Sequence, residues 1–140
     1  MTSKKLIIFI PSIEGYGVEK NLFIIVNFLS NYFKEIVVVS VSKKYKKNFK
    51  KKIYFMSPKN KFWESGGRLR KNLVCSFLLF KYLLLNKDCI VFSFQANLFA
   101  ILVSKLLNSD VVIRLNSAPS GWSSNPIKRS IFKFFFSFCR

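Results

Sequence analysis

Short apolar segments alternate with longer segments of helical periodicity along most of this chain. Lys4–Pro11 and Ile36–Val41 are runs of mainly apolar, β-branched and aromatic residues, and such runs are typical of strands buried on both faces. Between them, Val18–Phe33 repeats apolar residues at helical spacing. Because neighbouring parallel strands need crossover connections, usually helices, the alternation predicts an α/β fold with a doubly wound, Rossmann-like parallel sheet.

The same alternation continues toward the C-terminus. Further strands are expected at Lys52–Met56, Cys89–Phe94 and Asp110–Leu115, further helices at Arg68–Leu85 and Asn97–Leu107, a turn-rich loop at Asn116–Pro126 and a last helix from about Ile127. This order of elements matches one doubly wound half and predicts a parallel sheet ordered 3-2-1-4-5. The 140 residues form a single predicted domain, 1–140.

Several classes of site and segment are disfavoured by the composition. The three cysteines are widely spaced and the chain has no histidine, so neither a disulfide framework nor a zinc site is predicted. The longest uncharged run, Cys89–Ser104, carries Gln95 and Asn97 near its middle, which argues against a membrane-spanning helix. No signal peptide is recognised at the N-terminus. We therefore expect a cytoplasmic protein.

A formal charge of +18 is the unusual feature of the composition. Three interpretations stay open: a nucleic-acid partner, an anionic membrane surface, and compositional drift in a chain also rich in Ile, Phe, Asn and Tyr. The most basic stretch contains Lys43, Lys44, Lys46, Lys47, Lys50, Lys51 and Lys52. A solvated face is the ordinary role of such a run.

A second basic stretch surrounds two aromatic residues, Phe62 and Trp63. The flanking cations are Lys59, Lys61, Arg68, Arg70 and Lys71. Aromatic rings beside cations suit the interface of an anionic membrane, which predicts peripheral attachment to the cytoplasmic face. Single-stranded nucleic acid would use the same residue types, but no RNA- or DNA-binding motif accompanies them.

Polar residues follow the predicted strands and are the candidate ligand-binding residues. Gly15 and Gly17 precede a helix N-terminus, where free backbone N–H groups can hold a phosphate. Lys20 occupies the third glycine position of a dinucleotide fingerprint, so NAD binding is disfavoured. Arg114, at the carboxyl end of a strand, could pair with a phosphate bidentately. The remaining candidates are Gln95, Asn97 and Asn116. Helix capping by Asn97, a surface ion pair of Arg114 and turn formation by Asn116 are the simple alternatives.

Two segments resemble a known enzyme family. Leu6–Ser12 followed by Gly17-Val18-Glu19-Lys20 and a long amphipathic helix is similar to the opening of family-4 GT-B glycosyltransferases. The stretch Val111–Pro119 is similar to the Arg-x-Asn/Asp-x-x-Pro-like segment that follows the fifth strand of some members. The chain departs from the family at two points. Tyr16 separates two glycines that are commonly adjacent in the family. Many members carry a histidine after the fourth strand, where this chain has Ser93–Asn97.

The resemblance implies the N-terminal, acceptor-side half of a GT-B enzyme. Such an enzyme transfers a sugar from a nucleotide-sugar donor to a glycan or lipid-linked acceptor, as in cell-envelope polysaccharide biosynthesis. The resemblance places Gly15, Gly17 and Lys20 at a phosphate-binding loop. The expected C-terminal donor-binding domain, with its Glu-x(7)-Glu motif, is absent from these residues. We therefore expect a truncated or split chain without catalytic residues or a cofactor of its own. The alternative is a non-catalytic basic α/β module that binds an anionic membrane or nucleic acid.

Overall fold

The computed structural model describes residues 4–14, 17–50 and 53–115, together with single positions at 126, 130, 133, 134 and 137. Five strands alternate with three α-helices and two short 3-10 helices in this part of the chain. In chain order they are β1 (Lys5–Phe9), α1 (Gly17–Leu29), β2 (Ile36–Val39), η1 (Lys46–Asn48), β3 (Ile53–Met56), η2 (Lys61–Trp63), α2 (Arg68–Leu85), β4 (Cys89–Ser93), α3 (Asn97–Leu106) and β5 (Asp110–Ile113).

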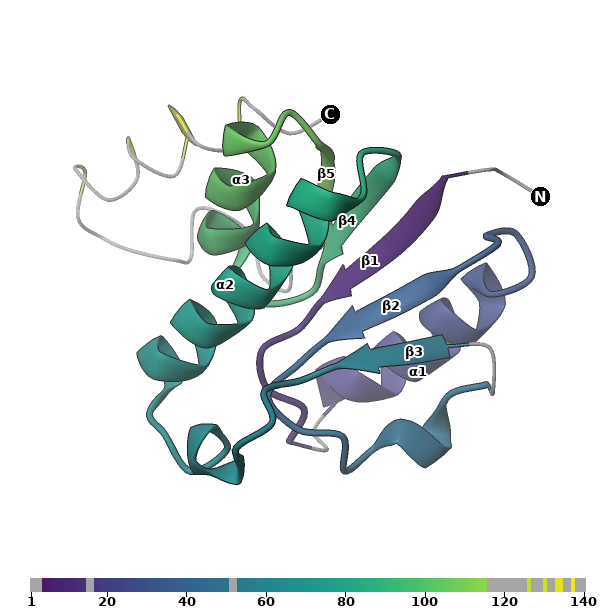
Figure 1. Cartoon of the computed structure of the whole chain (residues 1–140). Coiled ribbons are helices and arrows are strands. Elements are labelled where there is room, and N and C mark those ends of the chain that lie inside the picture. The colour runs from purple at the N-terminus through teal and green to yellow at the C-terminus, as the bar shows by residue number, and fades with distance from the viewer. Residues whose placement is uncertain are drawn as a thin grey trace.

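The strands form one parallel sheet in the order β3-β2-β1-β4-β5 (Figure 1). Strand β1 lies at the centre, with Ile7 beside Val37 of β2 on one side and beside Val91 of β4 on the other. This confirms the predicted doubly wound, Rossmann-like α/β class and the predicted strand order. The chain leaves β1 toward β2 and leaves β4 toward β5, in opposite directions along the sheet. This divergence opens a crevice at the carboxyl ends of β1 and β4.

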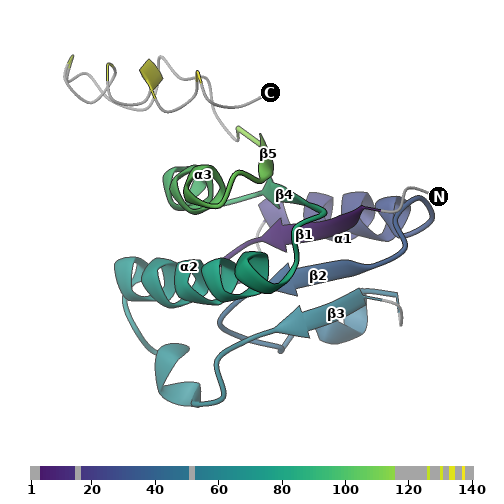
Figure 2. The same cartoon turned by 45° about the horizontal axis from the view of Figure 1, so that its top comes forward.

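Helices cover both faces of the sheet, α2 and α3 on one face and α1 on the other (Figure 2). Alternate residues of β1 serve the two faces. Ile7 and Phe9 belong to the buried cluster beneath α2 and α3, whereas Leu6 and Ile8 belong to the cluster with α1. Burial on both faces explains why β1 and β2 are almost continuously apolar, whereas the edge strands β3 and β5 carry exposed residues such as Tyr54 and Asp110.

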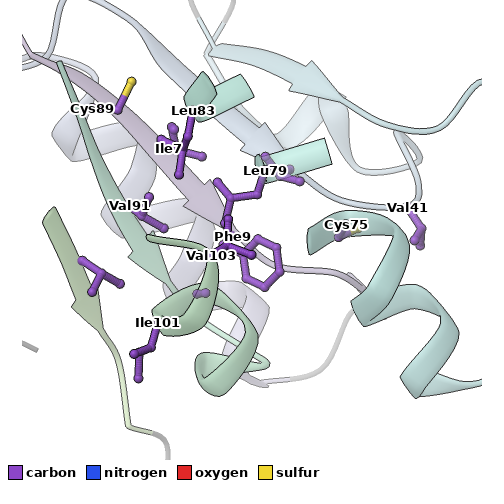
Figure 3. Close-up of a cluster of buried hydrophobic side chains, with 13 residues drawn as sticks. Ile7, Phe9, Val41, Cys75, Leu79, Leu83, Cys89, Val91, Ile101 and Val103 are labelled. Carbon is purple, nitrogen blue, oxygen red and sulfur yellow. The ribbon is translucent and has the colours of Figure 1, made fainter. Parts of the chain in front are cut away.

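The cluster beneath α2 and α3 is closely packed around Phe9 (Figure 3). Leu79 and Leu83 of α2 and Ile101 of α3 belong to this cluster, which also contains Ile7 and Phe9 of β1. Leu79, Leu83 and Ile101 are fully buried. Leu79 and Leu83 are one helical turn apart, so α2 presents a single apolar stripe to the sheet. This packing fixes the start of α2 relative to the ends of the strands.

The strands are shorter than their apolar runs predicted. Ile10, Val41 and Phe94 are buried but lie just beyond the ladder, where the chain turns into the loops. The two 3-10 helices were not predicted. Between β2 and β3, the described residues 40–50 contain η1 and no α-helix. Only single positions of the last predicted helix, from about Ile127, are described, and of these Ser130, Lys133 and Phe134 are helical. In the described part of the chain, no helix is long and apolar enough to span a membrane.

Candidate functional site

A pocket of about 500 Å³ lies at the carboxyl ends of β1, β4 and β5. Ligands of open α/β sheets bind in the crevice where the strand order reverses, and this pocket occupies that place. The loop after β1, the start of α2, the loop after β4 and the end of β5 contribute its walls. The lining residues are Ser12, Glu14, Arg68, Lys71, Asn72, Phe94, Gln95, Ala96, Asn97 and Arg114.

Asn97 joins the ends of β4 and β5 through its side-chain amide. Its Nδ2 donates to the Arg114 carbonyl at 3.1 Å, and its Oδ1 accepts from the Ser93 hydroxyl at 2.8 Å. Ser93 is fully buried, and its single proton is shared with the Gln95 carbonyl at 2.9 Å. The predicted capping alternative is wrong, because Ala96 is the N-cap of α3. Asn97 instead sets the distance between two walls of the pocket.

The turn into α3 is made by a residue with left-handed backbone geometry. Ala96 has φ 54° and ψ 42°, a conformation that costs a residue with a Cβ about 1 kcal/mol or more. Its carbonyl accepts from the Phe99 amide at 3.0 Å, so the turn leads directly into the helix. The consequence is a tight bend that keeps Gln95 and Asn97 on the wall of the pocket.

Arg114 follows β5 and is held at its backbone from two sides. Its amide donates to the Ser93 carbonyl at 2.9 Å, and its carbonyl accepts from Asn97. Its guanidinium carbon lies 5.5 Å from the centre of the Phe94 ring. The buried Nη1 has no hydrogen-bond partner, and Arg114 has no ion pair, within the described residues. The structure therefore gives no support to the surface ion pair that was the alternative for Arg114.

Opposite Arg114, three residues that we did not predict to line a ligand pocket form a polar group. The Ser12 hydroxyl donates to Glu14 Oε1 at 3.0 Å, and Lys71 Nζ lies 3.4 Å from Ser12 Oγ and 3.9 Å from Glu14 Oε1. Ser12 and Lys71 are 59 positions apart in sequence. The signal that could have indicated Lys71 is its helical spacing from Arg68, since residues three apart share a helix face.

The structure brings three of the predicted ligand-binding residues, Gln95, Asn97 and Arg114, into one pocket. Lys20 is exposed on α1 and does not line it. Gly17 is the first residue of α1. The predictions at Gly15 and Asn116 fall outside the described residues. Ligand binding by the predicted residues stays a prediction.

Glu19, in the first turn of α1, is buried behind the first loop. Its Oε1 accepts from the Glu14 amide at 3.4 Å, whereas Oε2 has no partner in the described ranges. A glutamate at the third helical position commonly reaches back to the backbone before the helix. Glu19 thereby contributes to holding the loop that carries Glu14 into the pocket.

The aromatic pair near the start of α2 is engaged by one arginine. The Arg70 guanidinium carbon lies 3.7 Å from the centre of the Phe62 ring and 4.9 Å from that of Trp63. A Cβ at Gly66 would lie 2.7 Å from Arg70 Cδ, so glycine permits this approach. Lys59 and Lys61 are exposed beside the rings. Arg68 differs from these residues, since it also lines the pocket.

One thiol lies directly beneath the pocket loop. Cys75 is fully buried, with Sγ 4.0 Å from the Pro11 carbonyl. Burial raises the pKa of this thiol to about 12, because a thiolate would be desolvated. Burial likewise raises the pKa of Cys89. Both thiols are therefore structural rather than nucleophilic near neutral pH.

The chain is similar in structure to a UGT transferase of Siraitia grosvenorii solved in complex with UDP. The match has a TM-score of 0.53 and 14% sequence identity, and it covers 83% of this chain. This chain has a glycosyltransferase-like fold. It spans 29% of the length of that transferase. No protein-family model and no curated protein sequence matches it.

Proposed function

We propose that this chain is the N-terminal, acceptor-side part of a family-4 GT-B glycosyltransferase. The enzyme would transfer a sugar from a nucleotide-sugar donor to a glycan or lipid-linked acceptor. The observation that carries the proposal is a polar pocket at the strand-order reversal of a glycosyltransferase-like fold. The limited coverage of the transferase structure is compatible with a donor-binding part that lies outside these 140 residues.

The polar side chains of the pocket suit an acceptor sugar. Asn72 and Gln95 line it, and neither side-chain amide has a hydrogen bond to another described residue. An amide offers two donors and an acceptor to sugar hydroxyls, but it cannot act as a general base near neutral pH. We therefore assign these residues to acceptor binding and assign no catalytic residue. Transfer needs the donor held against the acceptor, so the isolated chain should bind without turnover.

Saccharide binding by the 140-residue chain tests the proposal. Saturation-transfer NMR with a panel of monosaccharides and disaccharides should show contact that weakens in an Asn72→Ala/Gln95→Ala variant. The matched control is Asn21→Ala, since Asn21 is exposed on α1 and does not line the pocket. Tight binding of UDP or a UDP-sugar without saccharide binding would contradict the acceptor-side assignment. Failure to bind any saccharide would contradict the function itself.

A second element of the proposal is attachment to the cytoplasmic face of an anionic membrane through η2. The surface comprises Phe62, which is 55% exposed, with Trp63, Arg70, Lys59 and Lys61. Arg70 lies against both rings, which leaves less ring surface for stacking on bases and favours lipid over nucleic acid. Figure 1 places η2 beside the start of α2, and Arg68 of that helix lines the pocket. A membrane-bound acceptor would therefore meet the pocket opening.

Co-sedimentation with lipid vesicles tests the membrane surface. Each lysine near an anionic leaflet contributes about 1 kcal/mol, so Lys59→Gln/Lys61→Gln should weaken binding to phosphatidylglycerol-containing vesicles roughly 30-fold. The control is Lys34→Gln/Lys87→Gln, which removes the same charge just before β2 and β4, at the opposite edge of the sheet. The membrane surface at η2 would be rejected if the two double variants lost the same vesicle affinity, or if the chain bound pure phosphatidylcholine vesicles as tightly as anionic ones. Tighter binding to a single-stranded oligonucleotide would favour the nucleic-acid alternative.

A further inference from the structure

The pocket concentrates more positive charge than its own residues neutralise. Arg68, Lys71 and Arg114 line it, against the single carboxylate of Glu14. That carboxylate is weakly engaged, because its closest cation, Lys71 Nζ, is 3.9 Å away and the Glu14 side chain is 56% exposed. The lining therefore carries a formal charge of +2 (three cations less one carboxylate). A concave site with excess positive charge attracts an anionic ligand.

Lys71 and Arg114, which are both partly buried, have donors available to such a ligand. Nη1 of Arg114 is buried without a hydrogen-bond partner in the described part of the chain. Leaving a buried charged donor unpaired is costly, and a bound anion would remove that cost. The Lys71 side chain is only 18% exposed, and its contacts at 3.4 and 3.9 Å are long for hydrogen bonds. Both cations thus retain donors in a partly desolvated site.

The arrangement of the donors favours a phosphoryl group over a carboxylate. A guanidinium fork from the end of β5, an ammonium group from α2 and the Ser12 hydroxyl come from separate walls of the pocket. The Ser12 proton is donated to Glu14 Oε1 at 3.0 Å and would have to turn from it to reach a phosphoryl oxygen. A planar carboxylate is satisfied by one guanidinium, whereas the three or four oxygens of a phosphoryl group can accept from several directions. The start of α2 adds the positive end of its helix dipole, and its N-cap, Gly67, supplies no side-chain hydrogen bond.

Hydrogen bonds to the Arg114 backbone hold the Cα end of this side chain in place before any ligand binds. The Ser93 carbonyl and the Asn97 amide bind the Arg114 backbone, and the Phe94 ring lies beside the guanidinium. The pocket, at about 500 Å³, is also larger than one phosphate ion needs. The remaining space is bordered by the free amides of Asn72 and Gln95. The site is therefore suited to a phosphoryl group that carries a hydroxyl-rich moiety.

We propose that Arg114, Lys71 and Ser12 form a phosphoryl-binding subsite, with Arg68 at its rim, that holds a sugar bearing a phosphate group. The inference rests on the proposed function in taking the sugar to be the acceptor. A phosphate partner for Arg114 was expected from its place at the carboxyl end of a strand, and the pocket adds Lys71, Ser12 and Arg68 to it. The phosphoryl group has two sources, a soluble sugar phosphate and a lipid headgroup, which share the same chemistry at the subsite.

Calorimetric titration of the 140-residue chain with glucose 1-phosphate, glucose and inorganic phosphate tests the subsite. Glucose 1-phosphate should bind at least tenfold more tightly than glucose. Arg114→Gln should weaken the binding of glucose 1-phosphate at least tenfold. Arg114→Lys should have an affinity between those of the parent and Arg114→Gln, because lysine keeps the charge but loses the paired N–H donors of the guanidinium. The control, Lys81→Gln, removes an exposed charge of α2 outside the pocket and should change binding less than twofold. If Arg114→Gln fails to fold, Lys71→Gln supplies the same test.

Phosphatidylinositol vesicles, titrated in parallel, separate the two sources. A tenfold loss on Arg114→Gln in the vesicle arm alone identifies the lipid headgroup, and the same loss with glucose 1-phosphate identifies the soluble sugar phosphate. No loss in either arm overturns the subsite. Equal affinity for glucose and glucose 1-phosphate, with no loss in the vesicle arm, also overturns it, yet leaves saccharide binding and the proposed function standing. Inorganic phosphate bound as tightly as glucose 1-phosphate would keep the subsite and count against a sugar acceptor.

Discussion

Replacing Asn97 with alanine should destabilise the chain by about 2 kcal/mol. The change removes the 2.8 Å bond from Ser93 and the 3.1 Å bond to the Arg114 carbonyl, and each such bond contributes about 1 kcal/mol. Ser93→Ala should cost less, about 1 kcal/mol of the free energy of unfolding. The single hydroxyl proton of Ser93 is shared between the Asn97 Oδ1 and the Gln95 carbonyl, so it makes one strong hydrogen bond at a time. The double variant should lose about 1 kcal/mol less than the sum, since the Ser93–Asn97 bond is lost only once.

Urea unfolding followed by circular dichroism measures these losses. With a slope of roughly 1–3 kcal/mol/M, a 2 kcal/mol loss moves the midpoint by about 1 M, well outside error. Asn21→Ala, at an exposed position of α1, is the control and should stay within about 0.5 kcal/mol of the parent. A cost for Asn97→Ala below about 0.5 kcal/mol, or strict additivity with Ser93→Ala, would refute the assigned bridge between β4 and β5.

Three further predictions concern the scaffold of the pocket. Leu79→Ala should cost about 2–5 kcal/mol in the same unfolding assay, because Leu79 is fully buried between α2 and the sheet; a loss like that of the exposed Leu85→Ala would contradict this. Ala96→Gly should be neutral or stabilising by up to about 1 kcal/mol, since glycine adopts the left-handed geometry without strain, and a clear loss would refute the strain. The raised pKa of Cys75 means that the unfolded thiol loses its proton at lower pH than the folded one, so stability should fall by about 1.4 kcal/mol per unit from about pH 9 upward. Cys75→Ala should remove this contribution to the dependence of stability on pH. The same dependence in the variant would show that Cys75 does not contribute.

The centre of the sheet was predictable because β1 and β2 are buried on both faces. Burial on two sides disfavours polar residues at strand positions, so β2 reads as an uninterrupted apolar run. The ends of the strands were less predictable for the same reason. Ile10 and Phe94 remain buried after leaving the ladder, and apolar composition alone does not distinguish a paired strand residue from a buried loop residue.

The pocket was only partly predictable. Gln95, Asn97 and Arg114 follow strands directly, and the carboxyl ends of parallel strands meet at one edge. Lys71 belongs to a helix, and its closeness to Ser12 depends on how Leu79 and its neighbours set α2 against β1. The left-handed turn at Ala96 could not be anticipated, because alanine gives no sign of a positive φ.

The positive charge of the chain acts in two physically different places. Around η2, the exposed Lys59 and Lys61 would interact with the proposed membrane surface through water, where attraction is screened within about 8 Å at physiological ionic strength. In the pocket, Lys71 and the buried Nη1 of Arg114 lie in a partly desolvated site, where charges are screened less. The exposed lysines therefore suit attraction and orientation of the chain toward an anionic surface. In the proposed site, selection of the ligand would fall to the pocket cations, which are carried by the end of β5 and by the first turn of α2.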